Sequence, residues 1–263
     1  MMITRLTPIK NSLLSTCFSF GMIFFLTDHT FADERNRVQI DGIEFSLPAG
    51  LKLERAVPKS LVKWPVVVDW DCDGRLVVVE AGGAFKPIVE SNAKLLDKIV
   101  RLEDTDGDGV FDKKTIAADK LPLTQGVLCL GKSILAAAPP YIWKLTDNDG
   151  DGYCESREVW FDGQTLTGCA NDLHGPHLGI DGWIYWCKGA KAEQTHQLTD
   201  GSQLKDRAAH IFRRRLEGGE IESVMSGGME NLVEVAFTPT GDRFFSATFV
   251  QLPANGKRDG LGH

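Results

Sequence analysis

Four segments of the chain repeat one pattern, in which a tight turn with glycine joins two β-rich runs. The segments are VVVDWDCDGRLVVVE, GVLCLGKSILAAAP, PHLGIDGWIYWCKG and VEVAFTPTGDRFFSATF. Their turn glycines, at positions 74, 131, 182 and 241, are spaced by 57, 51 and 59 residues. These spacings are somewhat long for a four-stranded propeller blade of about 40 to 50 residues, which leaves room for loop insertions.

A second β-like pair follows each of the first three hairpins, as in DKIVRLED with KKTIAAD. Two hairpins make a four-stranded blade, so we predict an all-β fold, a β-propeller over residues 66–263 with blades at 66–120, 125–165 and 174–228. The fourth unit stops after its first hairpin, which gives about three and a half blades. An incomplete ring exposes a sheet face, so we expect the chain to be the N-terminal part of a longer protein.

The first 32 residues are typical of a secretory signal peptide. Arg5 and Lys10 precede the apolar run LLSTCFSFGMIFFL, and small residues at Thr30 and Ala32 suit cleavage after Ala32. An uncleaved anchor is the alternative, but the run is shorter than the roughly 20 residues needed to span a bilayer. We therefore expect an exported protein, either periplasmic or extracellular.

Residues 33–65 form a predicted entry segment before the first blade. Within it, GIEFSLPAGLKLERAV has β-like character and is expected to add a strand that helps to close the ring.

Charge and cysteine content exclude several classes of protein. The formal net charge of −7 argues against a nucleic-acid-binding protein, which needs a basic face for phosphate. Five cysteines remain after removal of the signal, so they cannot all pair, and we expect mostly buried free thiols. CxxC and CxxCH are absent, which excludes thioredoxin-like redox chemistry and covalent haem within this chain.

Two acidic loops, DTDGDGVFD and DNDGDGYCESRE, place oxygen donors at the positions used by EF-hand-like calcium loops. In the second loop the predicted Ca²⁺ ligands are Asp147, Asp149, Asp151, the Tyr153 carbonyl, Glu155 and Glu158. In the first loop they are Asp104, Asp106, Asp108, the Val110 carbonyl and Asp112. Thr115 replaces the twelfth-position acid, so the first loop should bind more weakly. Both would be structural sites in outer hairpins; solvated acidic turns are the alternative.

Two other charged clusters lack this pattern. Asp69, Asp71 and Asp73 alternate within the first hairpin and are interpreted as part of a turn. Arg213, Arg214 and Arg215 alternate on a strand, so Arg214 faces opposite to its neighbours, and we expect a solvated edge rather than an anion site.

The segment TGCANDLHGPHLGIDGWIYWCKG holds the candidate catalytic residues. Asn171, Asp172, His174 and His177 precede an inner-strand run, where a propeller presents groups to its central channel. A neutral histidine beside a carboxylate can act as a general base toward a substrate hydroxyl. The alternative is a polar loop between blades with hydrogen-bonded histidines. GxSxG, Walker, GxGxxG and HExxH motifs are absent.

Four stretches in order carry a resemblance to a known family: LEDTDGDGVFDKKTIAADKLPLTQGV, APPYIWKLTDNDGDGYCESREVWFDG, HGPHLGIDGWIYWCKG and GGMENLVEVAFTPTGDRFFSATFVQLPANGKRDGL. The chain resembles the N-terminal propeller part of exported, planctomycete-type dehydrogenase-like proteins that carry a haem-binding CxxCH. These proteins are related to quinoprotein glucose and sorbosone dehydrogenases.

The resemblance implies oxidation of a hydroxyl or aldehyde group of a sugar or alcohol with pyrroloquinoline quinone (PQQ). Because this chain has no CxxCH, it also implies a cytochrome c-type electron acceptor on missing sequence or on a partner. In the related sugar dehydrogenases a histidine shortly before a GxDGxIY-like strand is the base. GIDGWIY, residues 179–185, matches that strand, and His174 is the nearest counterpart, at a different distance. The quinone-binding arginines of the family find no match.

Two other interpretations remain open at this point. The chain could be a noncatalytic, calcium-stabilised propeller that binds glycans or partner proteins, or it could be a truncated fragment.

Overall fold

The computed structural model describes residues 35–82, 93–167, 172–249 and 259–263. The signal peptide predicted at residues 1–32 lies outside these ranges and stays a prediction. Among the described residues, no helix has the length and apolar character required to cross a bilayer.

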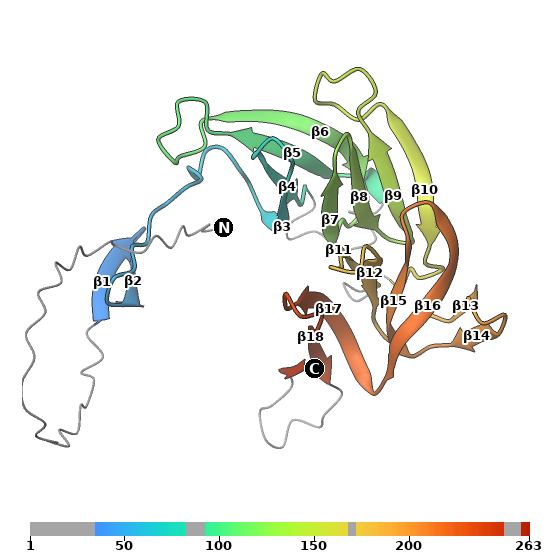
Figure 1. Ribbon diagram of the computed structural model, residues 1–263. Helices are drawn as coiled ribbons and strands as arrows, with labels where there is room; N and C mark the ends of the chain where they lie inside the picture. Colours follow the sequence, from blue (N-terminus) through green and yellow to red (C-terminus); the bar gives the residue numbers. More distant parts are fainter. Residues whose placement is uncertain (1–34, 83–92, 168–171, 250–258) are drawn as a thin grey trace, which may run out of the picture.

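Four antiparallel sheets follow one another along an arc (Figure 1). The first sheet contains β3 (Pro65–Trp70), β4 (Leu76–Glu80), β5 (Asp97–Glu103) and β6 (Lys113–Leu121). The second contains β7 (Gly126–Leu130), β8 (Ser133–Ala138), β9 (Tyr141–Thr146) and β10 (Ser156–Asp162). The third contains β11 (Leu173–Leu178), β12 (Ile184–Lys188), β15 (Ala209–Arg215) and β16 (Gly218–Gly227). The fourth contains β17 (Met229–Phe237), β18 (Arg243–Phe249) and β19 (Asp259–Gly262).

The predicted propeller of four-stranded blades is confirmed, and the first three sheets match the predicted blades within a few residues. All four turn glycines have positive φ, from 59° at Gly131 to 98° at Gly241, so glycine is required where each hairpin reverses. The Asp69 to Asp73 cluster lies at such a turn, as predicted: Asp71 accepts hydrogen bonds from the Asp73 and Arg75 amides.

The fourth unit does not stop after its first hairpin, which corrects the prediction. β19 pairs with β18 as a third strand. Gly262 allows this pairing, because a Cβ at that position would overlap the Phe245 ring. The segment DGLG carries no strong strand signal, since it is short and rich in glycine.

The expected ring-closing strand of the entry segment is also wrong. β1 (Arg35–Ile40) and β2 (Ile43–Pro48) pair only with each other and lie away from the four sheets (Figure 1). The turn between them is Asp41-Gly42, both with positive φ, the two-residue geometry that favours a local hairpin. A further hairpin, β13 (Gln194–Gln197) with β14 (Gln203–Asp206), is inserted in the third sheet.

Side chains alternate between the two faces of each sheet, and the buried ones form hydrophobic cores between neighbouring sheets. In β4, Val77 and Val79 pack into a core shared with the second sheet, whereas Leu76 and Val78 pack on the opposite side with Val57 of the entry segment. Equivalent cores join the second sheet to the third and the third to the fourth. Each fully buried Val or Leu contributes about 1.5–3 kcal/mol of hydrophobic free energy.

The arc stays open between its two ends. The inner strands contact one another in the order β3, β7, β11, β17, and no comparable contact joins β17 back to β3 within the described ranges. Val66 on the first sheet, and Val233 and Leu261 on the fourth, are exposed large apolar side chains. Within the described residues the fourth sheet has three strands, and these apolar side chains lie on the first and fourth sheets at the two ends of the arc.

The arginine run differs in part from its predicted solvated edge. Arg214 does face opposite to its neighbours, but it is buried, with its guanidinium carbon 4.0 Å from the Trp160 ring centre. Burial lowers the pKa of Arg214 to about 10, so it remains charged at neutral pH. Arg213 and Arg215 both pack over Trp183, at 4.5 and 4.3 Å. Stacking on aromatic rings allows the guanidinium to be desolvated here.

The described cysteines are free, as expected: Cys72, Cys129, Cys154 and Cys187. Cys169 lies outside the described residues.

Candidate functional site

The innermost strands of all four sheets surround a central cavity of about 470 Å³. Apolar side chains and backbone form most of its wall. Its polar and titratable side chains are Asp69, Gln125, His174, His177 and Glu234. Two of the predicted catalytic residues, His174 and His177, therefore do lie at the central channel.

A bulge in β11 brings the two histidines to one side of the sheet. Residues three apart in a regular strand face opposite sides. Here His174 pairs with Cys187 and His177 pairs with Tyr185, so one extra residue of β11 is accommodated between the pairs. Tyr185 and Cys187 both pack toward the fourth sheet, and their partners share that side. Glycine is needed where β11 meets β7, since a Cβ on Gly126 would overlap the Gly175 carbonyl.

His174 is held by the fourth sheet. Its Nε2 lies 3.1 Å from Oδ1 of Asn231 in β17. An amide oxygen can only accept, so the His174 Nε2–H donates this hydrogen bond. Asn231 thereby orients the ring of the candidate base.

His177 is a neutral imidazole over the physiological pH range. Burial, with a smaller contribution from His174, lowers its pKa to about 4. Its Nε2 is buried and has no hydrogen-bond partner among the residues that the structure describes. A ligand that reached this nitrogen could supply the missing partner.

Asp172 does not join the histidines. Its carboxylate accepts hydrogen bonds from the Thr165 hydroxyl at 2.8 Å and from the Thr167 hydroxyl at 2.8 Å. Asp172 comes just before the first paired residue of β11. Its position is therefore set by these two threonines, which lie in the connection from β10 to β11. Between Asp172 and either histidine, the described residues show no hydrogen bond, and the predicted carboxylate–histidine pair is not formed. Asn171 lies outside the described residues.

The acidic loops lie between the third and fourth strands of the first two sheets, as predicted. Their carboxylates converge in two groups whose oxygen atoms lie within 4.8 Å of one another. One group contains Asp147, Asp149, Asp151 and Glu155; the other contains Asp104, Asp106 and Asp108. The remaining predicted ligands include the carbonyls of Tyr153 and Val110, which belong to the same loops.

Two predicted acidic ligands have other partners. Glu158 lies in β10 and forms an ion pair with Lys144 at 2.8 Å. Asp112 accepts a hydrogen bond from the Thr105 hydroxyl at 2.7 Å. Neither carboxylate belongs to the convergent groups found in the described part of the chain.

The two loops have matching hydrogen bonds. Asp104 accepts from the amides of Gly107 and Gly109, each at 2.8 Å. Asp147 accepts from the amides of Gly150 and Gly152 in the same way, at 2.6 and 3.0 Å. The Gly109 amide is the main cause that holds the pKa of Asp104 below its ordinary value.

The eighth residue of each loop attaches its sheet to the preceding part of the chain. The Cys154 amide donates to the Ala117 carbonyl in β6, and the Phe111 amide donates to the Ala56 carbonyl in the entry segment, both at 2.8 Å. Arg101 of β5 donates to the Gly152 carbonyl. Sequence reasoning missed this role, although an apolar residue inside each acidic loop was a readable signal.

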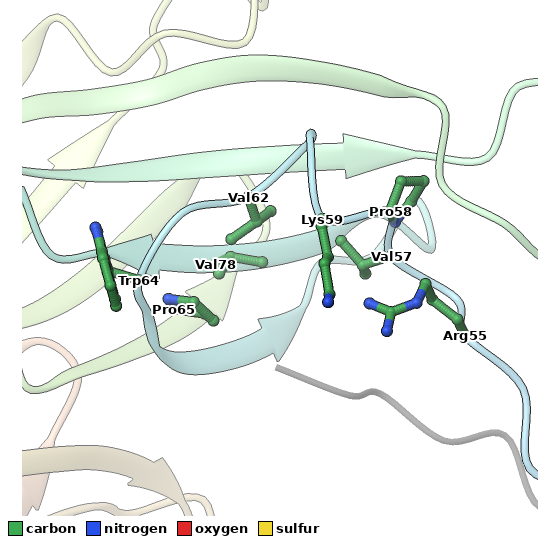
Figure 2. A pocket seen from close by; sticks show the side chains of 8 residues that line it. All are labelled: Arg55, Val57, Pro58, Lys59, Val62, Trp64, Pro65 and Val78. Atoms are coloured by element: carbon green, nitrogen blue, oxygen red, sulfur yellow. The ribbon is translucent and has the colours of Figure 1, made fainter. Parts of the chain in front are cut away.

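A smaller cavity of about 230 Å³ lies between the entry segment and the first sheet (Figure 2). Val57, Val62 and Val78 line it, and Trp64 stands at one end (Figure 2). The two cations at its other end, Arg55 and Lys59, both form ion pairs with Asp41. Its charged groups are thus already paired, and it offers less chemistry than the central cavity.

Sequence reasoning also missed four polar residues of the central cavity region: Asp69, Gln125, Asn231 and Glu234. A usable signal was present, because each lies in or next to an otherwise apolar inner strand. Their convergence depends on the stacking of the sheets and could not be derived from one strand alone.

Comparison with known proteins agrees with the fold. The family described as "Domain of unknown function (DUF7133)" matches residues 42–254. A search of curated proteins gives no significant match.

Two solved structures share the architecture. The PQQ domain of pyranose dehydrogenase from Coprinopsis cinerea, in its holo form, has a TM-score of 0.52 at 13% identity, over 75% of this chain and 47% of that chain. A Trichoderma reesei enzyme of carbohydrate-active family AA12 has a TM-score of 0.52 at 16% identity, over 79% and 53%. The chain thus spans about half the length of these neighbours, and at such identities the likeness shows the fold alone.

Proposed function

We propose that this chain, which belongs to the DUF7133 family, forms the substrate side of a site that oxidises a hydroxyl or aldehyde group of a carbohydrate or alcohol. The observation that carries the proposal is the pair His174 and His177, which a bulge directs into one central cavity. The two structural neighbours, a pyranose dehydrogenase domain and an enzyme of carbohydrate-active family AA12, support the substrate class.

The chain's own residues would act on a substrate hydroxyl as follows. His174 acts as the general base toward the hydroxyl proton, and its hydrogen bond to Asn231 orients the ring. Neutral His177 offers a hydrogen bond to a neighbouring substrate hydroxyl. Glu234, an exposed side chain of the lining, accepts a further one. Asp69 is partly engaged, since its Oδ2 accepts from the Cys129 amide at 2.7 Å.

The cavity does not by itself fit PQQ. This quinone carries three carboxylates and needs cationic or other strong donors. The described lining contains no lysine or arginine, and it contains the carboxylates of Asp69 and Glu234. PQQ and a cytochrome c-type acceptor therefore remain part of the proposal by family resemblance, and we assign no step to either.

Reconstituted turnover tests the oxidoreductase. The protein is incubated with Ca²⁺, PQQ, a panel of sugars and an artificial electron acceptor, and acceptor reduction is recorded. We expect His174→Ala to lower the rate at least 100-fold, since loss of a general base costs about 10²–10⁴. His263→Ala, a histidine outside the cavity lining, is the matched control. Absence of quinone binding, or equal rates for both variants, would contradict the proposal.

A noncatalytic carbohydrate-binding propeller is the second candidate. The described lining contains no lysine or arginine, and this favours the second candidate. The hydroxyl groups of a neutral sugar need only hydrogen-bonding side chains, which the lining has. Saturable sugar binding without turnover in the same preparation supports this second candidate over the first.

Structural Ca²⁺ in the two acidic loops and export of the protein complete the proposal. The convergent carboxylates support the first. The signal-like N-terminus supports the second, and fractionation of expressing cells tests it: a protein retained in the cytoplasm would contradict export.

A further inference from the structure

A separate cavity of about 240 Å³ lies between the first and second sheets, formed by the end of β6, the turn before β9, and the outer strands β9 and β10. Its wall is mostly apolar and includes Leu121 and three prolines. None of its residues lines the central cavity. It can therefore be altered without touching the histidine pair.

Two aromatic rings form a corner in this cavity. Tyr141 and Trp143 are two residues apart in β9, so they share one face of the sheet. Their ring centres are 5.3 Å apart with an angle of 81° between the planes. Arg157 pairs directly opposite Leu145, which packs toward the first sheet, so Arg157 belongs to the same face as the rings.

The charged side chains of this cavity are all positive. Lys120 and Arg157 line it, and the described lining has no Asp or Glu. Arg157 uses one nitrogen, Nη2, in an ion pair with Asp119 at 3.4 Å and in a hydrogen bond to the Tyr153 hydroxyl at 3.3 Å. Lys120 forms no ion pair with any residue that the structure describes. In a chain of net charge −7, two cations without an acid in the described lining favour an anionic ligand over a cationic one.

We propose that this cavity binds a hexuronic acid unit of an acidic glycan. The apolar face of the sugar ring packs against the corner formed by Tyr141 and Trp143. The carboxylate lies between Arg157 and Lys120, where charge-assisted hydrogen bonds form. The volume is at the small end for ligand sites, which are typically ~300–1,000 Å³, and therefore suits one ring.

Isothermal titration of the full chain with sodium glucuronate tests this inference, with glucose as the uncharged control. We expect saturable binding of glucuronate and at least tenfold weaker binding of glucose. Arg157→Gln should weaken glucuronate binding at least tenfold and leave glucose unchanged. Lys113→Gln, on the same strand as Lys120 but outside the cavity lining, should leave both unchanged.

Tyr141→Ala tests the ring contact, because it should weaken glucuronate binding while the circular dichroism spectrum stays that of the parent. Absence of saturable glucuronate binding in the millimolar range would overturn the inference. Unchanged glucuronate binding by a folded Arg157→Gln variant would overturn it too.

Discussion

His174 and His177 line one cavity but are held differently. A hydrogen bond to Asn231 orients His174, whereas His177 has a buried Nε2 without a partner in the described residues. We therefore assign the proposed proton-accepting role to His174 and the proposed contact with a substrate to His177 as a neutral group.

The lowered pKa of His177 predicts an acid-sensitive stability. An unfolded histidine has a pKa near 6.5, above the folded value of about 4, so between these limits the unfolded chain binds more protons. This contribution is complete above pH 6.5 and is lost as the pH falls toward 4, at a rate of at most about 1.4 kcal/mol per pH unit. Urea unfolding at pH 7 and pH 5 measures it.

His177→Gln should lose less stability than the parent chain between pH 7 and pH 5, because glutamine does not titrate. His263→Ala, at an exposed histidine, should follow the parent. An unchanged difference between the two pH values in His177→Gln would show that His177 does not cause the effect.

The acidic loops act at the scale of whole elements. Each loop contacts the preceding part of the chain through its eighth residue, as Cys154 does with β6. An ion that ordered the second loop would therefore strengthen the joint between the first two sheets as well as the hairpin itself.

Calcium should raise the melting temperature of the parent chain. Binding to the folded state alone adds about 2.7 kcal/mol at a concentration 100 times the dissociation constant. Asp149→Asn should remove most of this response, because Asp149 belongs to the convergent group. Glu158→Gln should keep it, because Glu158 pairs with Lys144. The melting temperatures are compared in about 5 mM Ca²⁺ and in about 5 mM EDTA. Equal responses from the two variants would contradict these ligand assignments.

An element can be predicted from the sequence when it depends on residues close together in the chain, and not when it depends on contacts between distant segments. The three four-stranded sheets were predictable because two-residue alternation and glycine turns are local signals. β19 was not, since it depends on the fit of Gly262 over Phe245. The histidines were identifiable from their position before an inner strand, but the bulge that directs both to one side, and the partners of Asp172, depend on packing across several elements.

The whole molecule is an open arc of four sheets with a cavity at its centre. Apolar side chains are exposed at both ends of the arc: Val233 and Leu261 at one end and Val66 at the other. Between the ends, each sheet is covered by its neighbour. The central cavity is nevertheless lined by residues of all four inner strands.

We propose that carbohydrate binds at the histidine pair of the central cavity. Histidine side-chain NMR spectra of the full chain during a titration with neutral sugars test it most directly. We expect saturable shifts of the His174 and His177 imidazole signals, with His196 and His210 unchanged. Shifts confined to His196 or His210, or no shift at any histidine at saturating sugar, would contradict it.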